Sequence, residues 1–191
     1  MIIEFPISRS VWYRFFRNAL EALPLGIFLT SVKLLDPTVR AEWRGPYLLS
    51  ALSAIAVTLI AVRGRRILNR IYFALALYFI SGAVGLLVGW AWLNDFYGST
   101  EATAMLIWIV AIGICAMGSR AGFIGVKSEN RKAVRLRSIG LLAVALIVTG
   151  LSWRFHGDAL LSAYVPFIIL FIAQALCARG VPQSRSHAIV G

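Results

Sequence analysis

Long apolar stretches alternate with short polar stretches along the whole of this chain. A helix needs about 20 mostly apolar residues to cross the hydrocarbon core of a bilayer, and six stretches come close to that length. They cover residues 18–35, 46–62, 71–93, 103–118, 138–153 and 159–178. The pattern predicts an all-α, polytopic integral membrane protein, a bundle of six transmembrane helices within residues 18–178.

The two ends of the chain differ from this central part. Residues 1–17 mix aromatic side chains with arginines, which predicts an amphipathic segment at the membrane interface. They lack an apolar core followed by a small-residue cleavage site, so we expect no cleaved signal peptide. Residues 179–191 contain Gly, Pro and several Ser residues and are predicted to be a disordered tail.

The basic residues orient the predicted helices. Most lie before the first span, between the second and third, between the fourth and fifth, or after the sixth. These are Arg9, Arg14, Arg17, Arg63, Arg65, Arg66, Arg70, Arg120, Lys127, Arg131, Lys132, Arg135, Arg137, Arg179 and Arg185, and the remaining ones are Lys33, Arg40, Arg44 and Arg154. Lys and Arg favour the cytoplasmic side of a membrane. We therefore expect both termini in the cytoplasm, and the plasma membrane, a bacterial inner membrane, as the location.

Composition supports lipid as the partner and argues against nucleic acid. Hydrophobic residues make up 60% of the 191, and the mean hydropathy is +0.81, which is too apolar for a soluble domain of this size. The net charge of +11 lies beside the ends of apolar stretches, where orientation and anionic headgroups explain it. In the basic stretch 119–137 we expect a solvated loop, partly helical around 129–137, with Arg131, Lys132 and Arg135 available to lipid phosphates; a protein partner is the alternative.

Small residues recur at four-residue intervals within the predicted spans. Such a spacing lets two helix backbones approach closely in lipid. The predicted helix-packing face consists of Ser81, Gly85, Gly89, Gly118 and Gly122. It serves either the tight packing of this bundle or self-association and contact with other membrane proteins. Tyr78 and Gln174 are predicted to supply hydrogen bonds between helices.

Glu21 is the clearest ionisable group inside a predicted span, and such groups are candidates for function. It forms either an interfacial ion pair with Arg17, four residues earlier, or a proton- or cation-coupling carboxylate beside a kink at Pro24. With Tyr164 and Gln174 it makes the candidate set of cavity residues.

Other chemistry has little support in the sequence. His156 and Asp158 share a turn, but a metal site needs three or four ligands and a triad needs a positioned nucleophile. Cys115 and Cys177 have no metal-binding or redox spacing and are expected to be small apolar fillers. Phosphate-binding, hydrolase and zinc-protease motifs are missing. We therefore predict no catalytic residue, cofactor or metal site, which favours a protein that is not an enzyme.

Two families have partial similarities to the chain. Six spans with cytoplasmic ends in 191 residues resemble the architecture of the substrate-binding subunits of energy-coupling-factor vitamin transporters, whose docking motif on the first helix has a partial counterpart in Ala19 and Ala22. The stretch LEALPLGIFLTSVKLLD (20–36), followed by RGRR (63–66), is similar in style to the N-terminal third of bacterial intracellular septation proteins. The resemblances point in different directions, so neither assigns a family and no functional residues are carried over.

Two functions fit the sequence. The first is a non-enzymatic, multi-pass inner-membrane protein that acts as an envelope or complex-assembly component through its helix faces. The alternative is a small-solute transporter, or the substrate-binding subunit of one, with a cavity near the bilayer midplane. An assembly component predicts a filled interior and a small-residue face turned outward, whereas a transporter predicts a cavity lined by Glu21 or Gln174.

Overall fold

The computed structural model describes residues 20–31, 44–64, 68–126, 128–158 and 160–179. These residues form helices, turns and short connections without any strand, which confirms the all-α class for this part of the chain. The predicted amphipathic segment 1–17 and the tail beyond Arg179 lie outside the described residues. Arg179 itself, predicted as the first residue of the tail, is the last residue of a helix.

Fewer helices qualify as membrane spans than the sequence pattern suggested. Four are long and apolar enough among the described residues: α2 (Arg44–Arg63), α3 (Arg70–Val88), α6 (Arg131–Arg154), and the continuous helix Leu160–Arg179, which comprises η2 (Leu160–Tyr164) and α7 (Val165–Arg179). The helices α4 (Ala91–Thr100) and α5 (Ala102–Ala116) add a fifth only if they are taken as one span, and they meet at a bend of 103°. Of the first predicted span, the described part is the shorter helix Leu20–Ser31. The long apolar helices suggest a membrane-embedded protein with four or five candidate spans.

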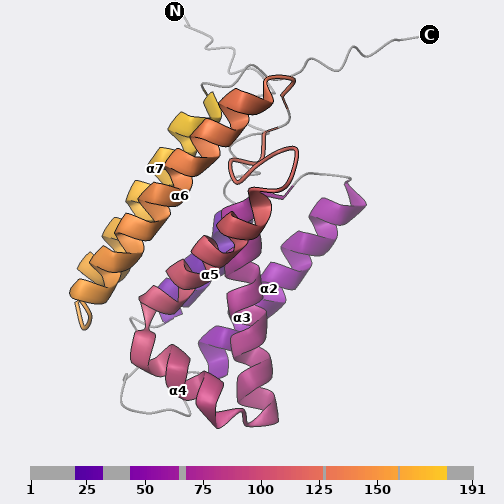
Figure 1. Cartoon of the computed structure of the whole chain (residues 1–191). Helices are drawn as coiled ribbons and strands as arrows, with labels where there is room; N and C mark the ends of the chain where they lie inside the picture. Colours follow the sequence, from indigo (N-terminus) through magenta and orange to yellow (C-terminus); the bar gives the residue numbers. More distant parts are fainter. Residues whose placement is uncertain (1–19, 32–43, 65–67, 127, 159, 180–191) are drawn as a thin grey trace, which may run out of the picture.

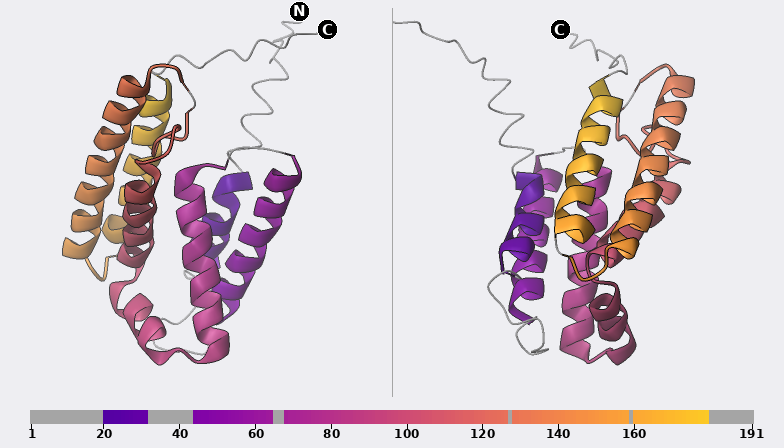
Figure 2. Two further views of the ribbon diagram at one scale, coloured as in Figure 1. Left: turned by 45° about the vertical axis from the view of Figure 1, so that its right-hand side comes forward. Right: turned by 90° about the vertical axis from the view of Figure 1, so that its left-hand side faces the viewer.

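The helices form two antiparallel pairs on either side of α5. The pair α6 and α7 lies on one flank and the pair α2 and α3 on the other, while α5 packs against both α3 and α6 (Figure 1). Helix α4 crosses one end of the bundle between α3 and α5 (Figures 1 and 2). The Leu20–Ser31 helix joins the α2–α3 pair, where the ring of Phe28 lies 5.1 Å from the rings of Tyr47 and Phe79, measured between centroids.

The third predicted span, 71–93, ends earlier than expected. Gly89 adopts φ +75°, and its N–H and that of Trp90 both donate to the carbonyl of Gly85. Glycine enters this left-handed conformation without the steric penalty that a Cβ brings, which is why it commonly terminates helices. The chain therefore leaves α3 after Val88, and a separate helix, α4, follows from Ala91 to Thr100.

The basic stretch 119–137 is not a solvated loop throughout. The helix predicted around 129–137 is confirmed as the first turns of α6, so α6 is longer than the predicted stretch 138–153. Before it, Phe123 and Ile124 are buried, and their backbone N–H groups donate to Oγ of Ser138 at 3.0 and 3.4 Å. Buried backbone N–H groups need an acceptor. Ser138 supplies one, so this apolar segment folds back into the bundle.

Charge is distributed unevenly between the two ends of the bundle. The ends of α2, α5 and α7 and the beginnings of α3 and α6 lie together (Figures 1 and 2). Within the described elements, the basic residues at this end are Arg63, Arg70, Arg120, Arg131, Lys132, Arg135, Arg137 and Arg179, and those at the opposite end are Arg44 and Arg154. The opposite end also carries Asp95, Glu101 and Asp158. The fold therefore gathers at one end the described basic residues that the sequence assigned to one side.

Candidate functional site

The three candidate cavity residues are not gathered around one space. Glu21 is half-buried within electrostatic range of the Tyr72 hydroxyl, near the start of α3. Gln174 lies in α7 and is 9% exposed. Tyr164 ends η2 on the same continuous helix, about 15 Å from Gln174 at 1.5 Å per residue. Glu21 and Gln174 therefore share one end of the bundle, and Tyr164 lies toward the other.

Gln174 forms a reciprocal amide pair with Asn69. Asn69 Nδ2 donates to Gln174 Oε1 at 3.0 Å, and Gln174 Nε2 donates to Asn69 Oδ1 at 2.6 Å. Asn69 Oδ1 also caps α3 by accepting from the N–H of Ile71 at 2.9 Å. The interhelical hydrogen bond predicted for Gln174 is confirmed. The pair ties α7 to the beginning of α3, so the Gln174 amide is engaged in the structure of the bundle.

A cluster of hydroxyl-bearing aromatic side chains occupies the interior between α2, α3, α4 and α5. The hydroxyls of Tyr47 and Tyr78 are 2.5 Å apart, which confirms the interhelical bond predicted for Tyr78. The Tyr97 hydroxyl lies 2.7 Å from Ser81 Oγ and accepts from Trp108 Nε1 at 2.8 Å. Buried tyrosine and tryptophan polar atoms normally find such partners. The cluster fills the space between these four helices with hydrogen-bonded rings.

The predicted packing face splits into two groups in the structure. Ser81 bonds Tyr97 of α4, a Cβ on Gly85 would lie 3.0 Å from Leu93 Cδ2, and one on Gly122 would overlap Ser138 Oγ. These three residues lie at close contacts between elements. Gly89 and Gly118 are exposed, and a Cβ at either would meet no side chain within 4 Å. The predicted packing face is therefore not one continuous contact surface.

Two further glycines at close contacts were missed by the sequence reading. A Cβ on Gly82 of α3 would overlap the ring of Tyr47 on α2. A Cβ on Gly113 of α5 would lie 3.0 Å from Leu142 Cδ1 and 3.1 Å from Phe123 Cε1. Gly82 could have been noticed in the sequence because it follows Ser81, the first residue of the predicted packing face. The sequence does not show which neighbouring ring fills the space beside it.

The candidate lipid-contact residues stand at the start of α6. Arg131, Lys132 and Arg135 are all exposed in its first turns. Arg137, two residues further on, instead donates from Nη1 to the Cys177 carbonyl near the end of α7 at 3.2 Å. The first three side chains are thus directed away from the bundle at its basic end, a position compatible with headgroup phosphates.

The turn between α6 and η2 places its polar residues at the surface. His156 Nδ1 lies 4.0 Å from Glu101 Oε2, and both side chains are 45% exposed. Asp158 Oδ1 accepts from the N–H groups of Leu160 and Leu161 at 2.9 and 3.2 Å, so it caps the helix that follows. Within the described residues, no group of three or more His, Cys, Asp and Glu could hold a metal ion.

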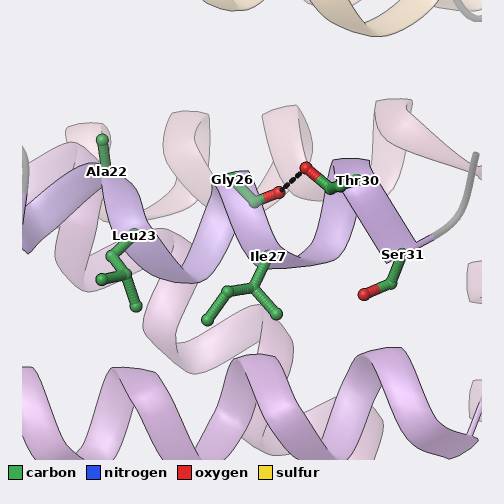
Figure 3. A pocket seen from close by; sticks show the side chains of 6 residues that line it. All are labelled: Ala22, Leu23, Gly26, Ile27, Thr30 and Ser31. Carbon is green, nitrogen blue, oxygen red and sulfur yellow. Dashed lines mark hydrogen bonds between the residues drawn. The ribbon is translucent and has the colours of Figure 1, made fainter.

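A shallow hollow, almost fully open to the outside, lies along the Leu20–Ser31 helix (Figure 3). Ala22, Gly26 and Thr30 lie along one edge and are exposed, and Leu23, Ile27 and Ser31 lie along the other. Thr30 Oγ1 donates to the Gly26 carbonyl at 2.7 Å, so its polar atom is satisfied within the helix. The hollow is therefore a shallow surface of a single helix, and small residues make up one of its two edges.

No family model, curated protein or solved structure matches this chain. Neither vitamin-transporter subunits nor septation proteins are therefore shown to be its relatives. We infer its function from the geometry described above.

Proposed function

We propose that this chain is a non-enzymatic, multi-pass protein of a bacterial inner membrane that takes part in assembling a membrane complex. Six helices cross or enter the bilayer, with both termini in the cytoplasm. The Leu20–Ser31 helix receives a transmembrane helix of another membrane protein on its small-residue face.

The outward surface of the bundle supports a lipid environment. Large apolar side chains are widely exposed on the long helices, including Leu87 at 72%, Leu136 at 71% and Ile147 at 69%. In water such a surface would drive association, whereas in hydrocarbon it needs no cover. The concentration of arginines at one end of the bundle supports placing that end in the cytoplasm.

The hollow on the Leu20–Ser31 helix is the observation on which the assembly role depends. This helix buries Pro24, Leu25 and Phe28 against the rest of the protein and leaves Ala22, Gly26 and Thr30 exposed four residues apart. Small residues at this spacing allow a second helix to approach closely, and dispersion then stabilises the contact in lipid. The interior between α2, α3, α4 and α5, by contrast, is occupied by the buried side chains of Tyr47, Tyr78 and Tyr97.

Replacing Gly26 with leucine tests this role. A leucine side chain in the hollow holds a partner backbone away, and overpacking of this kind costs about 1–3 kcal/mol, a loss of roughly 5- to 150-fold in affinity. We expect the wild-type protein, purified in mild detergent, to elute with a partner and to have a protein mass above the 21.0 kDa of one chain by light scattering, after the mass of the bound detergent is subtracted. The Gly26→Leu protein should elute as a folded monomer.

Gly140→Leu is the matched control, because Gly140 is also an exposed helical glycine with no atom within 4 Å of an added Cβ. It should keep the partner. A monomeric wild type, or a Gly26→Leu protein that retains its partner at the wild-type level, would rule out the assembly role. A complex made only of identical chains would replace the foreign partner with a second copy.

The transporter alternative has less support. It predicts a cavity lined by Glu21 or Gln174, whereas the Gln174 amide is paired with Asn69 and neither residue lines the hollow. The residues that line the hollow are different ones, and they lie on the outside of the bundle. We therefore prefer the assembly role.

A further inference from the structure

Helix α4 has three faces with different surroundings. Successive residues of an α-helix are rotated by about 100°, so residues three, four and seven apart share a face. Leu93, Tyr97 and Thr100 form a buried face. Trp92, Phe96 and Ser99 form a second, aromatic face, and its two rings are 66% and 40% exposed. Ala91, Asp95 and Gly98 form the third face, which is also exposed.

The buried face fixes α4 to the end of the bundle. The Tyr97 hydroxyl contacts Ser81 of α3 and Trp108 of α5, and Asn94 Nδ2 donates to the Gly85 carbonyl at 3.2 Å. These bonds connect α4 with both of the helices that it joins. Its orientation is therefore set by the fold, and its other two faces have fixed directions.

The direction of α4 differs from that of a membrane span. Gly89, at φ +75°, separates it from α3, and Glu101, at φ +46°, separates it from α5. Such a conformation is uncommon for a residue with a Cβ and marks a sharp change of direction. The bend of 103° between α4 and α5 sets α4 across the end of the bundle, as Figure 1 shows. If α5 runs through the bilayer, α4 runs along its surface.

The aromatic face of α4 continues the apolar surface of the bundle. Leu87 and Val88, 72% and 66% exposed, end α3 immediately before it, and the ring centroid of Trp90 lies 6.2 Å from that of Trp92. Trp153, 60% exposed, lies near the end of α6 at the same end of the bundle. Tryptophan favours the boundary between acyl chains and headgroups, because its ring is apolar and its N–H needs a polar partner. The third face of α4, with Asp95 and Gly98, borders the aromatic face and points away from the buried face.

We propose that α4 is an interfacial helix that lies in the outer leaflet, with Trp92 and Phe96 inserted at the boundary between headgroups and acyl chains and with the face of Asp95 and Gly98 in water. The occupant of the aromatic face is thus lipid and not a protein. This inference rests on the proposed function in one respect, because it requires the bundle to span a membrane with its basic end in the cytoplasm. It makes α4 an interfacial helix and α5 the part of the pair that enters the bilayer.

Spin labels at Trp92→Cys and Gly98→Cys test this placement. Both positions are exposed, and a Cβ on Gly98 meets no atom within 4 Å. The labels are introduced one at a time into full-length protein in which Cys115 and Cys177 are replaced by serine. The protein is reconstituted into vesicles of phosphatidylethanolamine and phosphatidylglycerol. Collision with oxygen, which concentrates in lipid, is compared with collision with a water-soluble nickel complex.

We expect the oxygen-to-nickel collision ratio to be several-fold higher at Trp92→Cys than at Gly98→Cys. Equal access of nickel to both labels would mean that α4 stands in water. Equal access of oxygen would mean that α4 crosses the lipid with α5, and protection from both reagents would mean that a protein covers it. Each of these three results overturns the inference. If the inference about α4 fails but the protein stays bound to the vesicles, its insertion in a membrane still stands. The complex-assembly role is tested separately by the Gly26→Leu experiment.

Discussion

Replacing Phe123 with alanine is expected to lower the free energy of unfolding by about 3–5 kcal/mol. The Phe123 side chain is fully buried, and its ring lies against Gly113 of α5. Removal of the ring leaves a cavity at the place where the segment after α5 folds back against α6. The change should appear as a shift of the unfolding midpoint in titration with SDS from mild detergent micelles.

Phe73→Ala is the control for this prediction, because Phe73 on α3 is 38% exposed on the apolar outside of the bundle. Detergent or lipid chains fill the space that the ring leaves, so little contact energy is lost there. The loss of stability should therefore be well below that of Phe123→Ala. Equal midpoints for the two variants would show that residues 121–126 are solvated and not packed.

Replacing Gly82 with valine is expected to break the contact between α2 and α3. A Cβ at this position overlaps the Tyr47 ring, which is 6% exposed and bonded through its hydroxyl to Tyr78. The Tyr47 ring cannot move aside without breaking its hydrogen bond to Tyr78. Overpacking of this kind costs about 1–3 kcal/mol or more. The β-branched side chain adds further atoms in the same place. We expect a lower yield of monodisperse protein and a midpoint lowered by several degrees in thermal unfolding.

Gly140→Val supplies the comparison, since Gly140 also lies within a helix but has open space around it. Valine and glycine both have modest helix propensity, so this substitution should change stability by less than about 0.5 kcal/mol. If Gly82→Val unfolds at the same temperature as Gly140→Val, the close approach of α2 and α3 at Gly82 is incorrect.

The all-α class could be predicted from the sequence because the apolar stretches have the length of helices that cross a bilayer. Helix ends were harder to predict. Residues 89–93 contain no charged side chain, so an apolar stretch read from the sequence extends through Gly89, although its backbone conformation ends α3. The segment 121–126 shows the opposite error. Arg120 and Lys127 on either side make it look polar, although the segment itself contains Phe123 and Ile124, which are buried.

The candidate sites could be predicted only in part, because the sequence does not show which elements lie opposite each other. A four-residue spacing identifies residues that share a helix face, and so it found Ser81 and Gly85. It does not identify the element on the other side, so Gly82 and its contact with Tyr47 were missed. The same applies to Gln174. Its polarity within an apolar helix signalled an interhelical bond, but its partner Asn69 is 105 residues away and is set by tertiary packing.

The most direct measurement of the central claim uses the two ends of one helix. Helix α6 has 24 residues, about 36 Å at 1.5 Å per residue, and begins and ends with an exposed arginine, Arg131 and Arg154. Single variants Arg131→Cys and Arg154→Cys, each without the native cysteines, are treated in intact cells with a maleimide that does not cross membranes. We predict labelling of Arg154→Cys in intact cells and of Arg131→Cys only after permeabilisation. Labelling of both before permeabilisation, or the reverse pattern, would contradict a bundle that spans the membrane with its basic end in the cytoplasm.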